Sequence, residues 1–348
     1  MVPLQALAVC ALGGAFCQFL KTPLPWMIGP LLAIALLKFS GVPLIAPKDG
    51  RELGQLVIGT ALGLYFTSQV AREVLGNWRL LIAAALLATA LGWICGLFLA
   101  RYTGIDKTTA FFTSVPGGAT EMAILGKRFG AKVDCIALAQ SLRILMVVVI
   151  IPFALTLSGA HGAGDFARTS MPADGVGLLQ LGALGTSAGA LPAWLRMSSA
   201  FMLEPLAVTI ALTVGEIRLS SMPTLISNAG QLLIGCALGS RFEQEFVGKA
   251  PRYLLAVAFS VVLAILLAAL CGWLLARLGG LAFPTMVLAT APGGIAEMCI
   301  TAKVLQLGVP LVTAAHVSRV LILVTTAAPL FRLVERLNAK RAMNHGPL

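Results

Sequence analysis

The segment Gly54-Gln55-Leu56-Val57-Ile58-Gly59-Thr60-Ala61-Leu62-Gly63 recurs as Gly230-Gln231-Leu232-Leu233-Ile234-Gly235-Cys236-Ala237-Leu238-Gly239, 176 residues downstream. The same shift then holds without a gap through the segments that follow both copies. Upstream the match is looser, and residues 27–31 resemble residues 202–206 at a shift of 175. A constant shift over this length indicates a duplication, which has to be recognised before a fold is assigned.

The composition places both copies in a membrane. The 348 residues are 58% hydrophobic and only 11% charged, with a mean hydropathy of +0.93, far outside the range of soluble globular proteins. The apolar runs are continuous instead of alternating, which favours helices over a β-barrel. The clearest runs are residues 80–100 and 253–276, each bracketed by arginines that can reach the membrane interfaces. We therefore predict an all-α integral membrane protein with about 10–12 hydrophobic segments.

The domain organisation follows from the duplication. We predict a first membrane repeat at residues 1–157, a polar linker at 158–175, a second membrane repeat at 176–333 and a short basic tail at 334–348. If all six segments of each half cross the bilayer, the halves are parallel; if one is re-entrant, or the first two form one broken span, they are inverted. We favour inverted halves with roughly ten crossings. The basic residues after residue 331 predict a cytoplasmic C-terminus.

Several classes of function are disfavoured by residue usage. The net charge of +11 is typical of loop Lys and Arg in a membrane protein, and no basic run interleaved with aromatics predicts direct nucleic-acid binding. The seven cysteines lie in or beside apolar runs without a CxxC pair, so we interpret them as packing residues and expect no metal site. No P-loop, GxSxG or HExxH motif occurs, and the three histidines are scattered. We expect neither enzymatic activity nor a cofactor.

Two Pro-Gly-Gly sequences interrupt apolar segments, at Pro116-Gly117-Gly118 and at Pro292-Gly293-Gly294. Proline removes a backbone donor and each glycine costs about 1 kcal/mol in a helix, so a helix break is expected at both places. Unwound backbone is tolerated at membrane depth only where it is buried in protein or lines a cavity. The N–H groups that begin the next half-helix suit an anion or a carboxylate. A packing kink is the alternative interpretation.

Each break is followed by a glutamate, Glu121 or Glu297, and 22 residues further by an arginine, Arg143 or Arg319. An unpaired charge at the bilayer centre costs about 2.5–3.5 kcal/mol or more, so each glutamate needs a partner, for which these arginines are the obvious candidates. One interpretation is a pair of structural salt bridges. The other is a substrate site in which Glu carries a proton or binds a cation, and Arg binds an anionic group.

The halves also differ at single positions. Gln140 corresponds to His316, and Gly29 corresponds to Glu204. His316 stands one helical turn from Arg319, so it is either a titrating site residue or a hydrogen-bonded core residue. We include His316 with the substrate-binding candidates.

The two Pro-Gly-Gly blocks, the segment Leu24-Pro25-Trp26-Met27-Ile28-Gly29-Pro30 and the paired Arg143 and Arg319 segments resemble the bacterial membrane AbrB family. The resemblance spans nearly the whole chain. It implies a duplicated multi-pass protein of the bacterial inner membrane, and the family's proposed kinship with cation-proton antiporter and bile-acid symporter folds favours inverted halves. Family members often carry the labels ammonia monooxygenase or regulator of gene expression. No oxygenase ligand set is present here, and Glu204 departs from the Gly-Pro pattern of the first half.

These observations predict a secondary transporter of a small solute, such as an anion or a weak acid. The alternative is a membrane-bound regulator of gene expression that acts indirectly and does not transport. The expected partners are the lipid bilayer and a small-molecule or ion substrate, without direct contact to nucleic acid. Self-association into a homo-oligomer is an open alternative.

Overall fold

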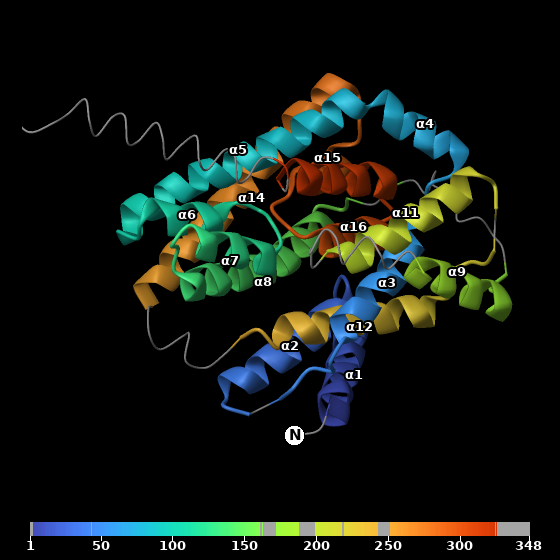
Figure 1. Ribbon diagram of the computed structural model, residues 1–348, viewed down its shortest axis with the longest axis horizontal. Coiled ribbons are helices and arrows are strands. Elements are labelled where there is room, and N and C mark those ends of the chain that lie inside the picture. Colours follow the sequence, from blue (N-terminus) through green and yellow to red (C-terminus); the bar gives the residue numbers. More distant parts are fainter. Residues whose placement is uncertain are drawn as a thin grey trace, which may run out of the picture.

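The structure is a computed structural model that describes residues 3–42, 44–160, 162, 172–187, 199–217, 219–242, 251–323 and 325. Within these ranges every regular element is a helix (Figure 1). Most of the expected polar linker and the whole of the expected basic tail, with its predicted cytoplasmic location, lie outside the described residues.

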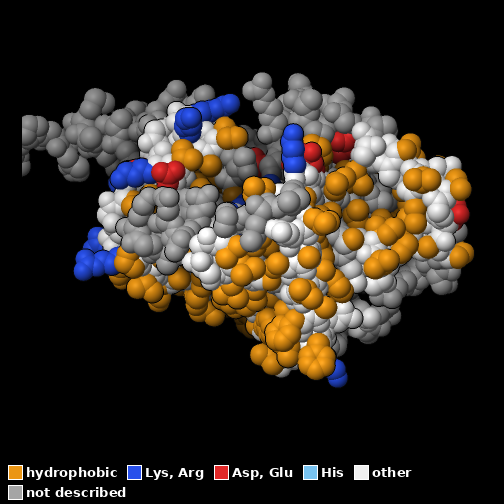
Figure 2. Space-filling model, turned by 90° about the horizontal axis from the view of Figure 1, so that it is seen from below, with side chains coloured by type: hydrophobic (Ala, Val, Ile, Leu, Met, Phe, Trp, Pro, Cys, Tyr) orange, Lys and Arg blue, Asp and Glu red, His pale blue; other side chains and the backbone are white. Residues whose placement is uncertain are grey.

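Within the described ranges, three helices are long and apolar enough to cross a bilayer: α5 (Trp78–Thr103), α8 (Val133–Leu157) and α14 (Pro251–Gly279). At 1.5 Å per residue, even 25 residues extend for about 37 Å, more than the ~30 Å of the hydrocarbon core. Large apolar side chains such as Leu12 and Leu266 point outward, and Figure 2 shows hydrophobic side chains spread over the face seen from below. Water disfavours such a surface, whereas lipid accepts it. The fold is consistent with a helical membrane protein.

The packing of the helices divides them into two bundles. What we call the hairpin bundle contains α5, α8 and α14, together with α6 (Lys107–Ser114), α7 (Ala119–Arg128), α15 (Phe283–Thr290), α16 (Ile295–Val304) and the helix Val309–Leu323. The framework bundle contains α1 (Pro3–Phe19), α2 (Pro25–Phe39), α3 (Gly50–Gly63), α4 (Ser68–Gly76), α9 (Gly175–Ser187), α11 (Ala200–Val214) and α12 (Thr224–Gly239). In Figure 1, α5, α6, α7, α8 and α14 of the hairpin bundle lie toward the upper left, and α1, α2 and α12 of the framework bundle lie toward the bottom. Among the labelled helices the two bundles meet mainly where α3 packs on α16 and α2 packs on α8.

Small residues set the crossings inside the framework bundle. A Cβ atom on Gly59 of α3 would lie 2.4 Å from the carbonyl oxygen of Met202 in α11, and one on Gly235 of α12 would lie 2.4 Å from that of Met27 in α2. No side chain fits at such a distance, so both positions require glycine. The two crossings involve residues that correspond in sequence, and each joins a helix of the first half to one of the second.

Helices α5 and α14, which correspond in sequence at the shift of 176, run in opposite directions. The rings of Phe98, late in α5, and Phe259, early in α14, stack with their centroids 5.5 Å apart. At the other end, a Cβ on Gly279 would lie 2.3 Å from Cδ1 of Leu80, at the start of α5. The two long helices are therefore antiparallel neighbours, as Figure 1 also shows.

Candidate functional site

Both Pro-Gly-Gly sequences break a helix where the sequence predicts it. Helix α6 ends at Ser114 and α7 begins at Ala119, while α15 ends at Thr290 and α16 begins at Ile295. We refer to α6 and α7 as hairpin 1 and to α15 and α16 as hairpin 2, because the chain reverses direction at each break.

Hydrogen bonds at the base of each hairpin establish the reversal. In hairpin 1 the backbone N–H of Lys132 donates to Oγ1 of Thr109 at 2.9 Å. In hairpin 2 the N–H of Gly308 donates to Oγ1 of Thr285 at 3.2 Å. A continuous helix would separate residues this far apart in sequence by about 35 Å. The Pro-Gly-Gly sequences are thus the tips of two helical hairpins.

Arg143 of α8 fastens the tip of hairpin 1. Its Nη1 donates to the carbonyl oxygen of Val115 at 3.0 Å and its Nη2 to that of Gly117 at 3.3 Å. Both carbonyls lie at the break, where the helical hydrogen-bond pattern is interrupted. The carbonyl oxygen of Val115 also accepts from Nε2 of Gln140 at 3.2 Å and from the N–H of Gly117 at 2.9 Å. The arginine therefore stabilises backbone that would be costly to bury on its own.

Arg319 makes the matching contacts in hairpin 2. Its Nη1 donates to the carbonyl oxygen of Ala291 at 2.7 Å, and its Nη2 donates to that of Gly293. Arg143 and Arg319 are only 5% and 2% exposed. Sequence spacing suggested glutamates as their partners. Both head groups donate hydrogen bonds to backbone carbonyls. Neither Nε atom has a hydrogen-bond partner within the described residues.

Glu121 and Glu297 occupy the first turns of α7 and α16. A Cβ on Gly118 would lie 1.8 Å from Oε2 of Glu121, and one on Gly294 would lie 2.0 Å from Oε2 of Glu297. Both carboxylates thus fold back over the glycine that precedes their helix, where the helix N-terminus favours negative charge. The second glycine of each Pro-Gly-Gly sequence leaves room for this arrangement.

The two hairpin tips meet at a cavity of about 90 Å³ between the two bundles. Nine of the candidate residues line it: Pro116, Gly117, Gly118, Glu121, Arg143, Gly293, Gly294, Glu297 and Arg319. Pro292 lies on a smaller cavity of about 20 Å³, on the α5 and α14 side of the tips, which Pro116 and Arg143 also line.

His316 is placed behind hairpin 2 and is not among the lining residues. Its Nε2 lies 2.9 Å from the carbonyl oxygen of Leu288 in α15, and its side chain is fully buried. Gln140, the corresponding residue, donates from Nε2 to the carbonyl oxygen of Phe112 in α6 at 2.9 Å. Phe112 and Leu288 also correspond at a shift of 176. The side chains of Gln140 and His316 therefore attach a hairpin to its neighbouring helix in the same way.

Three residues that the sequence did not single out also line the cavity: Arg51, Gln55 and Arg241. Arg51 and Gln55 belong to the first half of α3, and Arg241 follows α12. In sequence both arginines look like interface charges at the ends of apolar runs. Only the position of Gln55 in the repeated Gly-Gln-Leu segment offered a signal. The described residues contain no group of three or more His, Cys, Asp or Glu side chains suited to a metal ion.

The charge of the cavity favours an anion. Among the described lining residues four arginines face two glutamates, and each bundle supplies two of the arginines. Guanidinium groups pair well with carboxylate and phosphate oxygens. Removal from bulk water strengthens such pairing.

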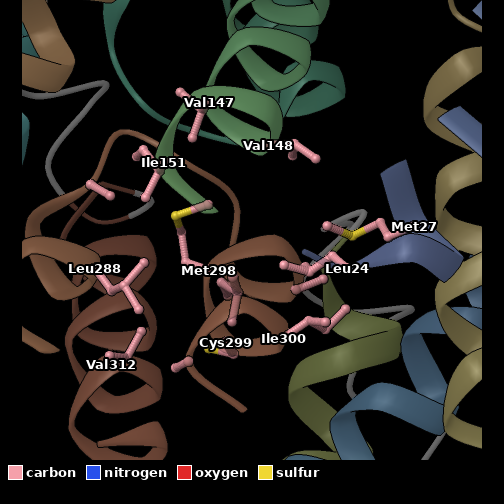
Figure 3. Packing of buried hydrophobic residues seen from close by; sticks show 14 of the residues in the cluster. Leu24, Met27, Val147, Val148, Ile151, Leu288, Met298, Cys299, Ile300 and Val312 are labelled. Atoms are coloured by element: carbon pink, nitrogen blue, oxygen red, sulfur yellow. The ribbon is translucent and has the colours of Figure 1, made fainter. Parts of the chain in front are cut away.

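The two hairpins differ in burial. Every residue from 295 to 302 in α16 is buried, and Figure 3 shows Met298 and Ile300 inside a cluster that also contains Ile151 of α8 and Leu24. In α7, by contrast, Ile124 is 49% exposed, while the corresponding Ile300 is 0% exposed. The framework covers hairpin 2 and leaves hairpin 1 more open.

The fold and the site together describe a helical membrane-type protein with a positively charged cavity at the tips of two helical hairpins. A family model described as "Transition state regulatory protein AbrB" matches residues 26–335. The chain belongs to this AbrB family. It is similar to "Putative regulator AbrB" of Escherichia coli (strain K12), with 25% identity over 93% of this chain and 94% of the relative. It is also similar to "Uncharacterized protein YhjN" of Bacillus subtilis (strain 168), with 26% identity over 96% of this chain and 94% of the relative.

Proposed function

We propose that this protein is a secondary transporter of a small anion or weak acid in the bacterial inner membrane, and that it has no enzymatic activity. The observation that carries the proposal is the cavity at the two hairpin tips. It is charged, it lies between the two bundles, and its walls include unwound backbone and arginines from both halves. Transporter sites typically lie at the interface of repeats and are formed by interrupted helices.

The proposal includes two inverted halves with about ten crossings. Helices α5 and α14 correspond at a shift of 176 and are antiparallel, which is the relation expected of inverted copies. A hairpin that folds back at its tip enters and leaves on one side, so each half would contribute five crossings and one re-entrant hairpin. Because five is an odd number, the second half starts on the opposite side of the membrane from the first half and has the inverted topology.

Transport would require the hairpin bundle to move against the framework bundle. Hairpin 2 is held to the framework by Lys303, whose Nζ donates to Oγ of Ser227 in α12 at 2.9 Å. The corresponding first-half residues are Lys127 and Arg51, two like charges that cannot form the same bond. In this state the framework bundle packs closely on hairpin 2 and leaves hairpin 1 more open. Such an asymmetry is expected for one end state of alternating access.

Flux measurements test the proposal. Purified protein in proteoliposomes with an imposed proton or sodium gradient should take up at least one member of a panel of small organic anions. Glu297→Gln should abolish the dependence on the gradient, whereas Arg277→Gln, a change on α14 beside Trp273, should leave flux intact. Absence of gradient-driven uptake across the panel in folded protein would refute transport.

A membrane-bound regulator is the second candidate, because the family description and the name of the E. coli relative both refer to regulation. Such a role would be indirect, acting through a partner. A strain lacking the gene should then recover normal transcript levels with a Glu297→Gln variant that shows no gradient-driven uptake. Recovery only with transport-competent variants would favour the transporter.

A further inference from the structure

We propose that the cavity binds a small dianion with one anionic group at each end, such as a short dicarboxylate, and that Arg143 and Arg319 each hold one end. This inference rests on the proposed transport function and specifies its class of substrate. Four observations about the described residues support it: the charge, the unused donors, the symmetry and the size of the cavity.

The charge of the lining side chains calls for two negative charges. The lining residues include four arginines and two glutamates, which gives a formal excess of two positive charges when both glutamates are ionised. Arg51 and Arg241 come from the framework bundle, and Arg143 and Arg319 come from the hairpin bundle. The like charges of the two bundles repel across the cavity, and a dianion between them removes that repulsion. A monoanion would compensate only half of it.

The donors of Arg143 and Arg319 point to the contacts that such a ligand would make. A guanidinium carries five N–H groups, and the bonds to the hairpin carbonyls use one N–H of Nη1 and one N–H of Nη2 in each arginine. The Nε–H of each is buried without a partner, which costs about 1–3 kcal/mol or more for a charged group. Both arginines line the cavity, so an oxygen of a bound carboxylate can accept a hydrogen bond from an N–H of each guanidinium that the hairpin carbonyls do not use.

The arrangement of the two donors favours a ligand with two similar ends. Arg143 and Arg319 correspond at a shift of 176 and hold corresponding carbonyls, Val115 with Ala291 and Gly117 with Gly293. Each half thus contributes one equivalent arginine to one shared cavity. A ligand with a carboxylate at each end can place one carboxylate at the arginine of each half.

The volume limits the length of the ligand. A buried water needs about 10–15 Å³ of this kind of space, so the 90 Å³ cavity accommodates roughly six to nine water-sized groups. A four-carbon dicarboxylate has eight non-hydrogen atoms and lies within this limit. The amide of Gln55, whose Oε1 has no hydrogen-bond partner, can contact the middle of such a chain.

Binding measurements on the purified full-length protein test this inference. Succinate should bind at least tenfold more tightly than butyrate, which has the same carbon chain and one carboxylate, and more tightly than sulfate, whose two charges share one centre. Calorimetry or thermal-shift titration would measure this. Equal binding of butyrate would refute the requirement for two charges, and equal binding of sulfate would refute the two-ended geometry.

Variants locate the site. Arg143→Gln and Arg319→Gln should each weaken succinate binding at least tenfold. These two changes also remove bonds to the hairpin tips, so Gln55→Glu serves as a second variant. It preserves the size of the side chain and both arginines, and it adds a negative charge to the cavity. It should weaken the binding of succinate at least tenfold. Arg277→Gln, outside the cavity, should not change affinity. Unchanged succinate affinity in folded Gln55→Glu protein would exclude the cavity.

The two proposals can fail separately. Succinate binding in the cavity without flux would refute transport and preserve the dianion site. Gradient-driven flux of a monovalent anion, with no succinate binding or competition, would preserve transport and refute the dianion site.

Discussion

Hairpin 1 and hairpin 2 share their local structure and differ in their surroundings. Their helices begin and end 176 residues apart, and an arginine holds each tip through corresponding carbonyls. Yet α16 is buried along its first eight residues, while Ile124 of α7 is half exposed. The difference teaches that local sequence determines the shape of a hairpin, whereas its packing against the framework determines how accessible and how stable it is.

The largest effect is expected from removal of the arginine that holds a tip. Arg319→Ala leaves the carbonyls of Ala291 and Gly293 buried without partners, which should cost about 3 kcal/mol or more. Arg143→Ala should cost less, since the contact of Arg143 with Gly117 is only partly buried. Thermal unfolding in detergent, followed for both variants, measures the difference. A larger loss for Arg143→Ala would contradict the burial difference.

A matched pair of isoleucines should show the next largest effect. Ile300→Ala removes a fully buried side chain and should destabilise by about 2–4 kcal/mol. Ile124→Ala acts at a half-exposed position and should cost less than about 1 kcal/mol. The midpoints of thermal unfolding provide the measurement. Equal losses would mean that hairpin 1 is as enclosed as hairpin 2.

The helix caps differ as well and predict a smaller effect. Asp106 caps α6, because its Oδ1 accepts the N–H of Thr109 and its Oδ2 accepts the Thr109 hydroxyl, both at 2.7 Å. Ala282, at the start of α15, makes no side-chain cap. Asp106→Ala should destabilise by about 1 kcal/mol, and Ala282→Asp should stabilise by no more than that. Unfolding midpoints that moved in the opposite directions would refute the capping argument.

The smallest effect is the pH dependence of this cap. Burial raises the pKa of Asp106, but hydrogen bonds from the side chain and backbone of Thr109 outweigh it and hold the pKa below its ordinary value of 3.8. The contribution of the ionised cap is therefore fully present above the unfolded-state pKa and is lost as the pH falls through the folded-state pKa. The difference in unfolding midpoint between wild type and Asp106→Asn should shrink as the pH is lowered from 7 to 3. A difference that grew instead would contradict the sign of the shift.

Much of the local structure could be predicted from sequence because it depends on short-range chemistry. The breaks at Pro116 and Pro292 follow from a missing backbone donor and from adjacent glycines, and the long helices follow from uninterrupted apolar residues bracketed by arginines. The role of Arg143 was harder to predict. Spacing alone suggested Glu121 as its partner, and it could not show that Nη1 and Nη2 donate to the carbonyl oxygens of Val115 and Gly117 at the helix break.

The cavity shows the same limit. Sequence reasoning found the symmetric residues, since the shift of 176 marks them, but it missed Arg51 and Arg241, whose counterparts at that shift are Ser227 and Tyr65. His316 looked like a site residue one turn from Arg319. The structure turns its ring toward the carbonyl oxygen of Leu288 instead.

By itself, the sequence determined that this protein is helical and apolar, that its segments correspond at one shift, and that two helices break at Pro-Gly-Gly. These properties depend on neighbouring residues and on composition. Only the tertiary structure decided that the hairpin tips meet, that four arginines converge on one cavity, and that the framework covers one hairpin more than the other. Those properties arise from contacts between segments far apart in the chain, where packing and unsatisfied backbone groups select the partners.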